Sequence, residues 1–107
     1  MSLESAEMID AIGIDTASNA VILTVIDSWD WNDMGKHLLA LKAKLNAYLA
    51  FIEDGQLWKS YPNAFGRKIE INIVARFPLP SEGLILLDRI KREAAQSGIT
   101  IGSQIHE

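Results

Sequence analysis

Apolar residues along the chain follow two different periodicities, which together predict four strands and two helices. Two β-rich runs, 8–14 and 20–26, flank the turn-forming stretch DTASN and predict a β-hairpin. The second run is apolar on both faces, which is typical of a central strand. Alternation of apolar and mostly polar residues over 68–77 predicts a third strand with one apolar face, and 99–105 predicts a fourth.

Two longer segments have the spacing of amphipathic helices. The first covers 31–53 and ends at Asp54-Gly55, and its predicted core-facing ridge is Met34, Leu38, Leu41, Leu45, Tyr48, Leu49 and Ile52. The second covers 81–97, with Ser81 as its N-cap and Gly98 as its stop signal. Its predicted buried stripe is Leu84, Leu87, Ile90 and Ala94. The stretch 56–67 between the first helix and the third strand is predicted to be a connecting loop.

These elements predict an α+β protein with the order β-β-α-β-α-β. The expected architecture is a two-layer sandwich, in which two helices cover one face of a four-stranded sheet. The strand order stays open. At 107 residues, 49% of them hydrophobic and 22% charged, the chain is expected to form a single domain over 1–107, with 1–7 as a flexible N-terminal arm.

Composition excludes several classes of function. The chain has no cysteine, which rules out disulfides and thiolate zinc sites and suits a reducing cytoplasm. The N-terminal MSLESAEM lacks the basic and apolar regions of a signal peptide, and no apolar run has the length of a membrane span. A net charge of −4 gives no general attraction to phosphate backbones. We therefore expect a cytoplasmic protein that binds neither nucleic acid nor membrane.

The stretch SWDWNDMGKH, residues 28–37, has the composition of a site but is also explained as a helix start. With Asp30 as N-cap, Asp33 falls at the third helical position, where an acid can complete a capping box. Trp29 and Met34 then occupy the two places of a hydrophobic staple. His37 is expected to be a flanking residue paired with Asp33 one turn away.

A chemical interpretation of the same stretch is weaker. A calcium loop that begins at Asp30 is satisfied at Asn32 and Gly35, but Met34 and Leu41 occupy two of the ligand positions. No familiar catalytic or nucleotide-binding motif occurs in the chain. We expect no catalytic residue, no metal and no cofactor. The alternative is a small-ligand or metal-binding protein with weak hydrolase chemistry at Asp30, Asp33 and His37, joined by Asp27. That alternative requires a concave pocket in which at least two of these side chains are free.

The first helix has a second apolar face opposite its ridge. The members of this alanine face are Leu39, Ala40, Ala43, Ala47, Ala50 and Phe51. Alanine is the best helix former and is harmless on a surface, so the face has a purely structural explanation. Small residues would equally let another helix approach closely, from the same chain or from a second copy. The alanine face is therefore a candidate homodimer interface.

Aromatic and basic residues alternate in the loop before the third strand, on an otherwise acidic chain. With the polar face of that strand, they give a candidate binding surface composed of Trp58, Tyr61, Phe65, Arg67, Lys68, Glu70, Asn72 and Arg76. Such a combination suits recognition of an anion, a peptide or a partner surface. The simpler interpretation, which we favour from the sequence, is that the aromatic rings fold back over the core and the basic groups remain in water.

Three stretches of the chain resemble a known family. DSWDW at 27–31, HLLALKAKLNAYLAFIEDGQL at 37–57 and YPNAFGRKIEINIV at 61–74 are similar to an uncharacterised family of small bacterial proteins, a domain of unknown function. The similarity runs from Ile9 to about Ile101. It implies a bacterial, cytoplasmic, stand-alone domain, and it supplies no catalytic residues.

The sequence thus predicts a non-enzymatic module that binds a protein partner or a second copy of itself. An accessory role would fit this description. The small-ligand or hydrolase alternative stays open, as does a structural role without a specific ligand.

Overall fold

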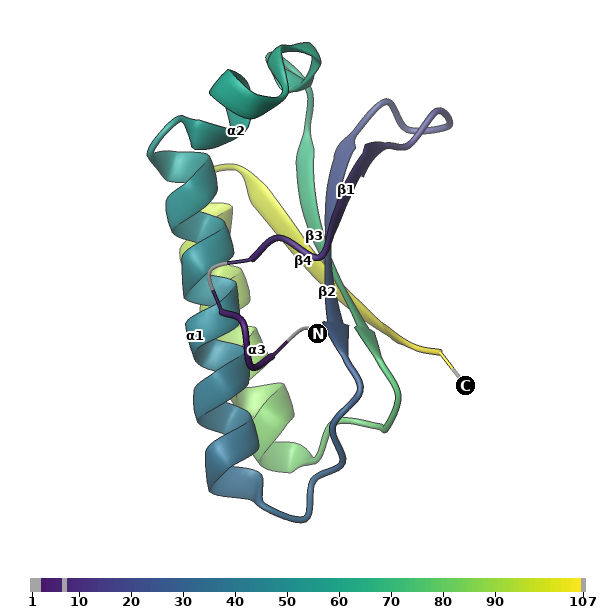
Figure 1. The fold of residues 1–107 in the computed structure, drawn as a ribbon, viewed down its shortest axis with the longest axis vertical. Coiled ribbons are helices and arrows are strands. Elements are labelled where there is room, and N and C mark those ends of the chain that lie inside the picture. The colour runs from purple at the N-terminus through teal and green to yellow at the C-terminus, as the bar shows by residue number, and fades with distance from the viewer. Residues whose placement is uncertain (1–2, 7, 107) are drawn as a thin grey trace.

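A computed structural model describes residues 3–6 and 8–106, and it shows a mixed four-stranded sheet packed with helices (Figure 1). The α+β class is therefore confirmed. The strands are β1 (Ala11–Ile14), β2 (Val21–Asp27), β3 (Ile69–Ala75) and β4 (Ile99–Ile105). They lie in the order β1-β2-β3-β4, with β1 antiparallel to β2, and with β2, β3 and β4 parallel to one another. The two central strands are thus β2 and β3.

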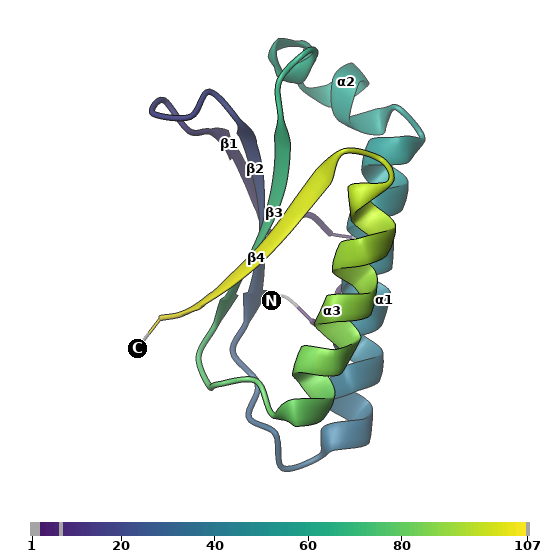
Figure 2. The same cartoon turned by 180° about the vertical axis from the view of Figure 1, so that it is seen from behind.

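Two long helices connect the parallel strands. α1 (Met34–Glu53) leads from β2 toward β3, and α3 (Ser81–Ala95) leads from β3 to β4. Parallel neighbours need such crossovers, because the chain must return to the end from which the previous strand began. Figures 1 and 2 show α1 and α3 side by side on the same face of the sheet.

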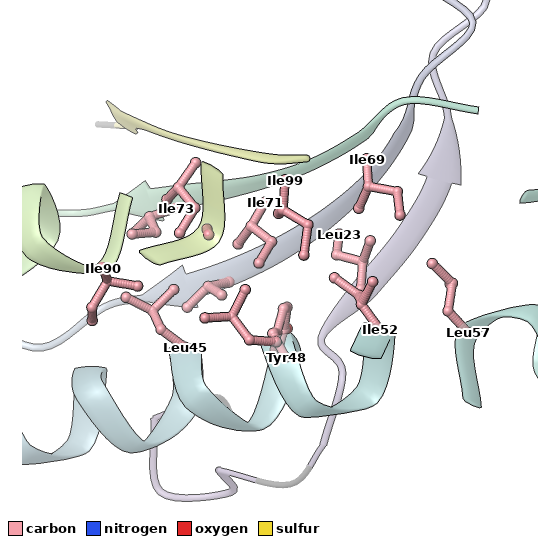
Figure 3. Close-up of a cluster of buried hydrophobic side chains, with 14 of the residues drawn as sticks. Leu23, Leu45, Tyr48, Ile52, Leu57, Ile69, Ile71, Ile73, Ile90 and Ile99 are labelled. Carbon is pink, nitrogen blue, oxygen red and sulfur yellow. The ribbon is translucent and has the colours of Figure 1, made fainter. Parts of the chain in front are cut away.

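The core lies between that face and the two helices. Leu23, Ile71 and Ile101 stand opposite one another on adjacent strands, and each is at most 5% exposed. From α1, Leu45 and Tyr48 reach into the same layer, as Figure 3 shows. The period of two along each strand explains this arrangement, because alternate side chains share a face.

No helix covers the other face of the sheet in the part of the chain that the structure describes (Figures 1 and 2). By the strand registers, this open face carries Ile22, Thr24, Ile26, Glu70, Asn72, Val74, Thr100, Gly102 and Gln104. Ile26 is 44% exposed there, and Val74 is half-buried.

The segment expected to be a loop contains helical structure, so that prediction was wrong. α2 (Gln56–Ser60) and the short 3-10 helix η1 (Pro62–Ala64) follow α1 directly. Gly55, at a φ of 84°, turns the chain between α1 and α2. Leu57 of α2 is fully buried, and this anchor holds a helix too short to give a periodic signal in the sequence.

The prediction of a second helix is confirmed in its position, but its N-cap and one of its buried residues were wrong. Ser81 does not cap it: Pro80 is the N-cap, and its carbonyl accepts a hydrogen bond from the Leu84 amide at 3.0 Å. Leu84 is 54% exposed, since the buried stripe passes through Gly83 instead. A Cβ on Gly83 would lie 3.4 Å from the ring of Trp31, so the missing side chain lets that ring approach α3 closely.

Candidate functional site

The acidic stretch before α1 forms two successive local turns. The Asp30 carboxylate accepts hydrogen bonds from the backbone amide of Asn32 at 3.0 Å and from its side-chain amide at 3.1 Å. Asp33 is the N-cap, and its carboxylate accepts from the Lys36 amide at 3.2 Å. The prediction that Asp30 caps the helix was therefore wrong: Asp30 closes the turn that precedes the cap.

Trp29 and Met34 do not occupy the two positions of a hydrophobic staple, because α1 begins at Met34 with Asp33 as its N-cap. The Trp29 indole meets the imidazole of His37 edge-on, with ring centroids 5.6 Å apart. Lys36 Nζ stands 5.5 Å from the centroid of the same indole. The start of α1 is thus packed around His37.

His37 is a core residue rather than a flanking one. Its side chain is 1% exposed, with Nδ1 2.8 Å from the Asp30 carbonyl oxygen and Nε2 2.6 Å from Oδ2 of Asp27. The predicted pairing with Asp33 was wrong, because position 37 stands one helical turn before Leu41 and shares its inward face.

These contacts locate a proton between His37 and Asp27. The Asp30 carbonyl can only accept, so Nδ1 must carry a hydrogen and donate it. In a neutral imidazole Nε2 would then be bare. The hydrogen in the 2.6 Å contact therefore comes either from a protonated Asp27 carboxyl group or from an imidazolium. In both cases one proton lies in the contact between Nε2 of His37 and Oδ2 of Asp27. The other Asp27 oxygen accepts from the Trp29 amide at 3.2 Å.

Tryptophan rings seal this pair from solvent. Trp31 stacks on His37 with centroids 3.5 Å apart and planes inclined by 13°, and Gly83 of α3 lies on it. The Trp31 Nε1 is buried without a hydrogen-bond partner, which costs about 1–3 kcal/mol. A catalytic base must reach its substrate. With both side chains 1% exposed, the pair instead joins the end of β2 to the start of α1.

The conditions set for the hydrolase alternative are met only in part. A hollow of about 360 Å³ is lined by Ser28, Trp29, Asp30, Asp33 and Lys36. Both carboxylates are bonded to backbone amides, and both nitrogens of His37 face other partners. Among residues 3–6 and 8–106, no group of three or more histidine or acidic side chains could hold a metal ion.

A second buried cluster, which sequence reasoning missed, surrounds Lys44 of α1. This side chain is fully buried, and its Nζ donates to the carbonyls of Ser5 and Met8, both at 2.8 Å, and to Oδ1 of Asp10 at 3.0 Å. Oδ2 of Asp10 accepts from the Ile26 amide at 2.9 Å. The lysine therefore joins the N-terminal segment to α1. The aspartate provides a hydrogen-bond acceptor for the Ile26 amide of β2, at a position that β1 does not reach.

Tyr48 completes this cluster from one turn further along α1. Its hydroxyl donates to the Thr24 carbonyl at 2.5 Å and accepts from the Asp10 amide at 2.8 Å. Burial raises the pKa of Tyr48 to about 12. The burial of Lys44 could have been inferred from its position, which lies at helical spacing among the ridge residues. A charged side chain at such a position must find partners inside the protein.

The structure brings part of the candidate binding surface together. Trp58 and Phe65 meet edge-on with centroids 5.7 Å apart. Tyr61 lines a hollow of about 370 Å³ between the α2–η1 segment and β1. Phe65 is 76% exposed and Tyr61 is 47% exposed, so these rings do not fold back over the core. Trp58, Tyr61 and Phe65, with the adjoining Arg67 and Lys68, are called the aromatic end below.

Arg67 belongs to the aromatic end, whereas Glu70, Asn72 and Arg76 lie outside it. Arg67 is held by bonds to the Asn63 carbonyl, at 2.7 Å, and to the side chain of Asn19 in the β1–β2 turn. Glu70 and Asn72 are on the open face of β3. Arg76 follows the far end of that strand and stands 5.7 Å from the ring of Phe77. The strand separates Arg76 from the aromatic end.

The alanine face of α1 is only partly open. Leu39 is 71% exposed, and Ala43 and Ala50 are also exposed. Ala40 and Phe51 are half-buried and pack against the core. Leu39 is thus the large apolar side chain that this face presents to solvent.

The fold and these contacts define a small α+β protein with two buried polar pairs, His37–Asp27 and Lys44–Asp10. The chain belongs to a family of unknown function, DUF6572, which it matches over residues 1–107. The resemblance noted in the sequence is thereby confirmed. Comparisons with curated proteins and with solved structures give no match. Within the described residues, no helix has both the length and the apolar character needed to cross a bilayer.

Proposed function

We propose that this protein is a non-enzymatic, cytoplasmic module that binds a protein partner through the aromatic end. The observation that carries the proposal is the exposure of Phe65 and Tyr61, at 76% and 47%, with Tyr61 lining an open hollow. Aromatic side chains and arginine are enriched in protein interfaces, and exposed rings that flank a hollow are typical anchors.

The chemistry of the aromatic end specifies the kind of partner. Lys59 and Lys68 are exposed beside the rings, and Arg67 is partly exposed. Within a chain of net charge −4, this end is locally basic. A partner with acidic side chains around an apolar contact would be complementary in charge, which favours encounter and orientation. The proposed role is that of an accessory protein of a bacterial cell.

The small-ligand alternative has less support. The side chains that would perform the chemistry are bonded within the protein, and the Asp27–His37 pair is sealed by Trp31. The hollow at the aromatic end offers an apolar contact surface rather than a set of reactive groups.

Quantitative capture from the native lysate tests the proposal. We expect a stoichiometric partner with the wild-type chain and its loss with Phe65→Ala/Tyr61→Ala, which removes only exposed rings and should leave the fold intact. Leu39→Ala on α1 is the control, because Leu39, at 71%, is about as exposed as Phe65. Capture that survives the ring truncations but is lost with Leu39→Ala would contradict the proposal and place binding on the alanine face.

A further inference from the structure

The outer edge of β4 has free backbone groups. The His106 amide donates to the Ala75 carbonyl of β3 at 2.8 Å, so the backbone groups of position 106 point toward β3. Successive residues of a strand alternate in this direction. The amides and carbonyls of Ile99, Ile101, Ser103 and Ile105 therefore point away from the sheet, where the described structure places no further strand.

This edge lacks the devices that normally prevent strand pairing. β4 is seven residues long, ITIGSQI, and contains neither a charged residue nor a proline. Natural proteins protect free edges with lysine, proline, bulges or very short strands. The opposite edge of the sheet follows that rule, since β1 has only four residues. β4 thus has the properties of a strand that another strand covers.

Exposed apolar side chains accompany the free edge. Phe77, Leu84 and Ile105 are 37%, 54% and 51% exposed. A hollow of about 340 Å³ beside them is lined by Ala75, Phe77, Pro78, Leu79, Leu84, Ser103, Gln104 and Ile105. Figure 2 shows the reason: the C-terminal end of β4 runs away from α3, so the helix does not cover it.

We propose that two copies of this chain pair through their β4 edges, antiparallel, about a twofold axis at Gly102. In this register Ile101 lies opposite Ser103 of the second copy, and Ile99 lies opposite Ile105. All four residues point their backbone groups outward, so every free group on the edge gains a partner. The pairs also share faces: the exposed Ile105 is placed beside the buried Ile99 of the other copy.

The neighbouring face of α3 fits the same axis. Leu84, Asp88, Lys91 and Ala95 fall within about 60° of the helix circumference, and Leu84 lines the hollow beside β4, which puts this face on the β4 side. Antiparallel pairing of two such faces sets Leu84 opposite Ala95, and Asp88 opposite Lys91 of the second copy. The same helix face thus provides both members of an apolar pair and both members of a charged pair. This self-complementarity favours a second copy of the chain over an unrelated strand.

The proposed interface is separate from the aromatic end. The hollow beside Tyr61 is lined by β1, at the opposite edge of the sheet from β4. A dimer formed through β4 would keep both aromatic ends accessible. The dimer and the proposed protein partner can therefore fail independently.

Analytical ultracentrifugation of the full chain at micromolar concentrations gives the first test. We expect a dimer for the wild type and a folded monomer for Ser103→Pro, because the proline removes an outward amide without touching the β3–β4 ladder. Ser103→Ala keeps that amide and should stay dimeric. A monomeric wild type would overturn the proposal, as would a dimer that persists in a folded Ser103→Pro but is lost with Ala43→Glu/Ala47→Glu on α1.

A charge reversal tests the register even if the proline variant fails to fold. Asp88→Lys and Lys91→Glu should each weaken self-association by about tenfold at low salt, because each sets like charges opposite one another. Mixed together, the two variants should form a heterodimer of wild-type affinity, since both cross-axis pairs become attractive. Equal affinity for every combination would overturn the proposed pairing.

Discussion

Nε2 of His37 lies 2.6 Å from Oδ2 of Asp27, and neither side chain is more than 1% exposed. A histidine and an aspartate in such contact resemble catalytic machinery. Here the remaining nitrogen of His37, Nδ1, donates to the Asp30 carbonyl, and Trp31 stacks on the imidazole ring. The contact joins the last residue of β2 to the first turns of α1.

Removing the carboxylate should show what this contact contributes to stability. Asp27→Ala leaves Nε2 of His37 buried without a hydrogen-bond partner. We expect this substitution to lower the free energy of unfolding by about 3–5 kcal/mol. Asp27→Asn should cost much less. Its amide nitrogen can donate to the bare Nε2, and its oxygen can still accept from the Trp29 amide. Urea unfolding of the two variants measures the difference, and equal losses would contradict the shared-proton geometry.

Tyr48 makes stability depend on pH in the alkaline range. Its pKa is raised from 10.0 to about 12 in the folded chain, because burial disfavours the phenolate. The stabilisation is therefore complete below pH 10 and is lost between pH 10 and pH 12, as the unfolded chain gives up a proton that the folded chain keeps. The full effect is about 2–3 kcal/mol.

Tyr48→Phe is the control for this titration. The variant should be less stable at neutral pH, because the Thr24 carbonyl and the Asp10 amide lose their partner. Between pH 10 and pH 12, its unfolding free energy should decline less steeply than that of the wild type. Parallel profiles for the two proteins would show that Tyr48 ionises normally in the fold.

Lys44 should hold the N-terminal segment in its position against α1. Lys44→Met removes the donor that binds the Ser5 and Met8 carbonyls, and it leaves Asp10 buried without that cation. We expect a loss of about 3–5 kcal/mol and faster amide exchange at Ile26, whose amide is bonded to Asp10. Lys42→Met, at an exposed position of the same helix, should change neither quantity.

The elements with strong periodicity could be predicted, and those fixed by single anchors could not. Alternation in β3 and the ridge of Leu41, Leu45 and Tyr48 placed those elements correctly. α2 has only five residues, and its helix depends on the burial of Leu57. Leu84 has the spacing of a core residue, but it is 54% exposed, and the C-terminal end of β4 runs away from α3. Sheet twist is a property of the whole layer and leaves no local mark in the sequence.

The candidate site shows the same division. The sequence grouped aromatic and basic residues in one candidate surface, but the favoured expectation was that the rings fold back over the core. Phe65 and Tyr61 are instead exposed in the structure. The inward positions of His37 and Lys44 were missed, because a polar residue on a helical ridge is normally assigned to the flank. The free edge of β4 depends on the strand order, which is fixed by long-range pairing and left open by the sequence.

Hydrogen exchange on the complex isolated from the native lysate would show whether the partner binds the aromatic end. We expect slower exchange in residues 58–67 of the bound chain than in the free chain, and no comparable change along the outer face of α1. Slower exchange confined to α1, or an exchange pattern unchanged by the partner, would contradict the assignment of binding to the aromatic end.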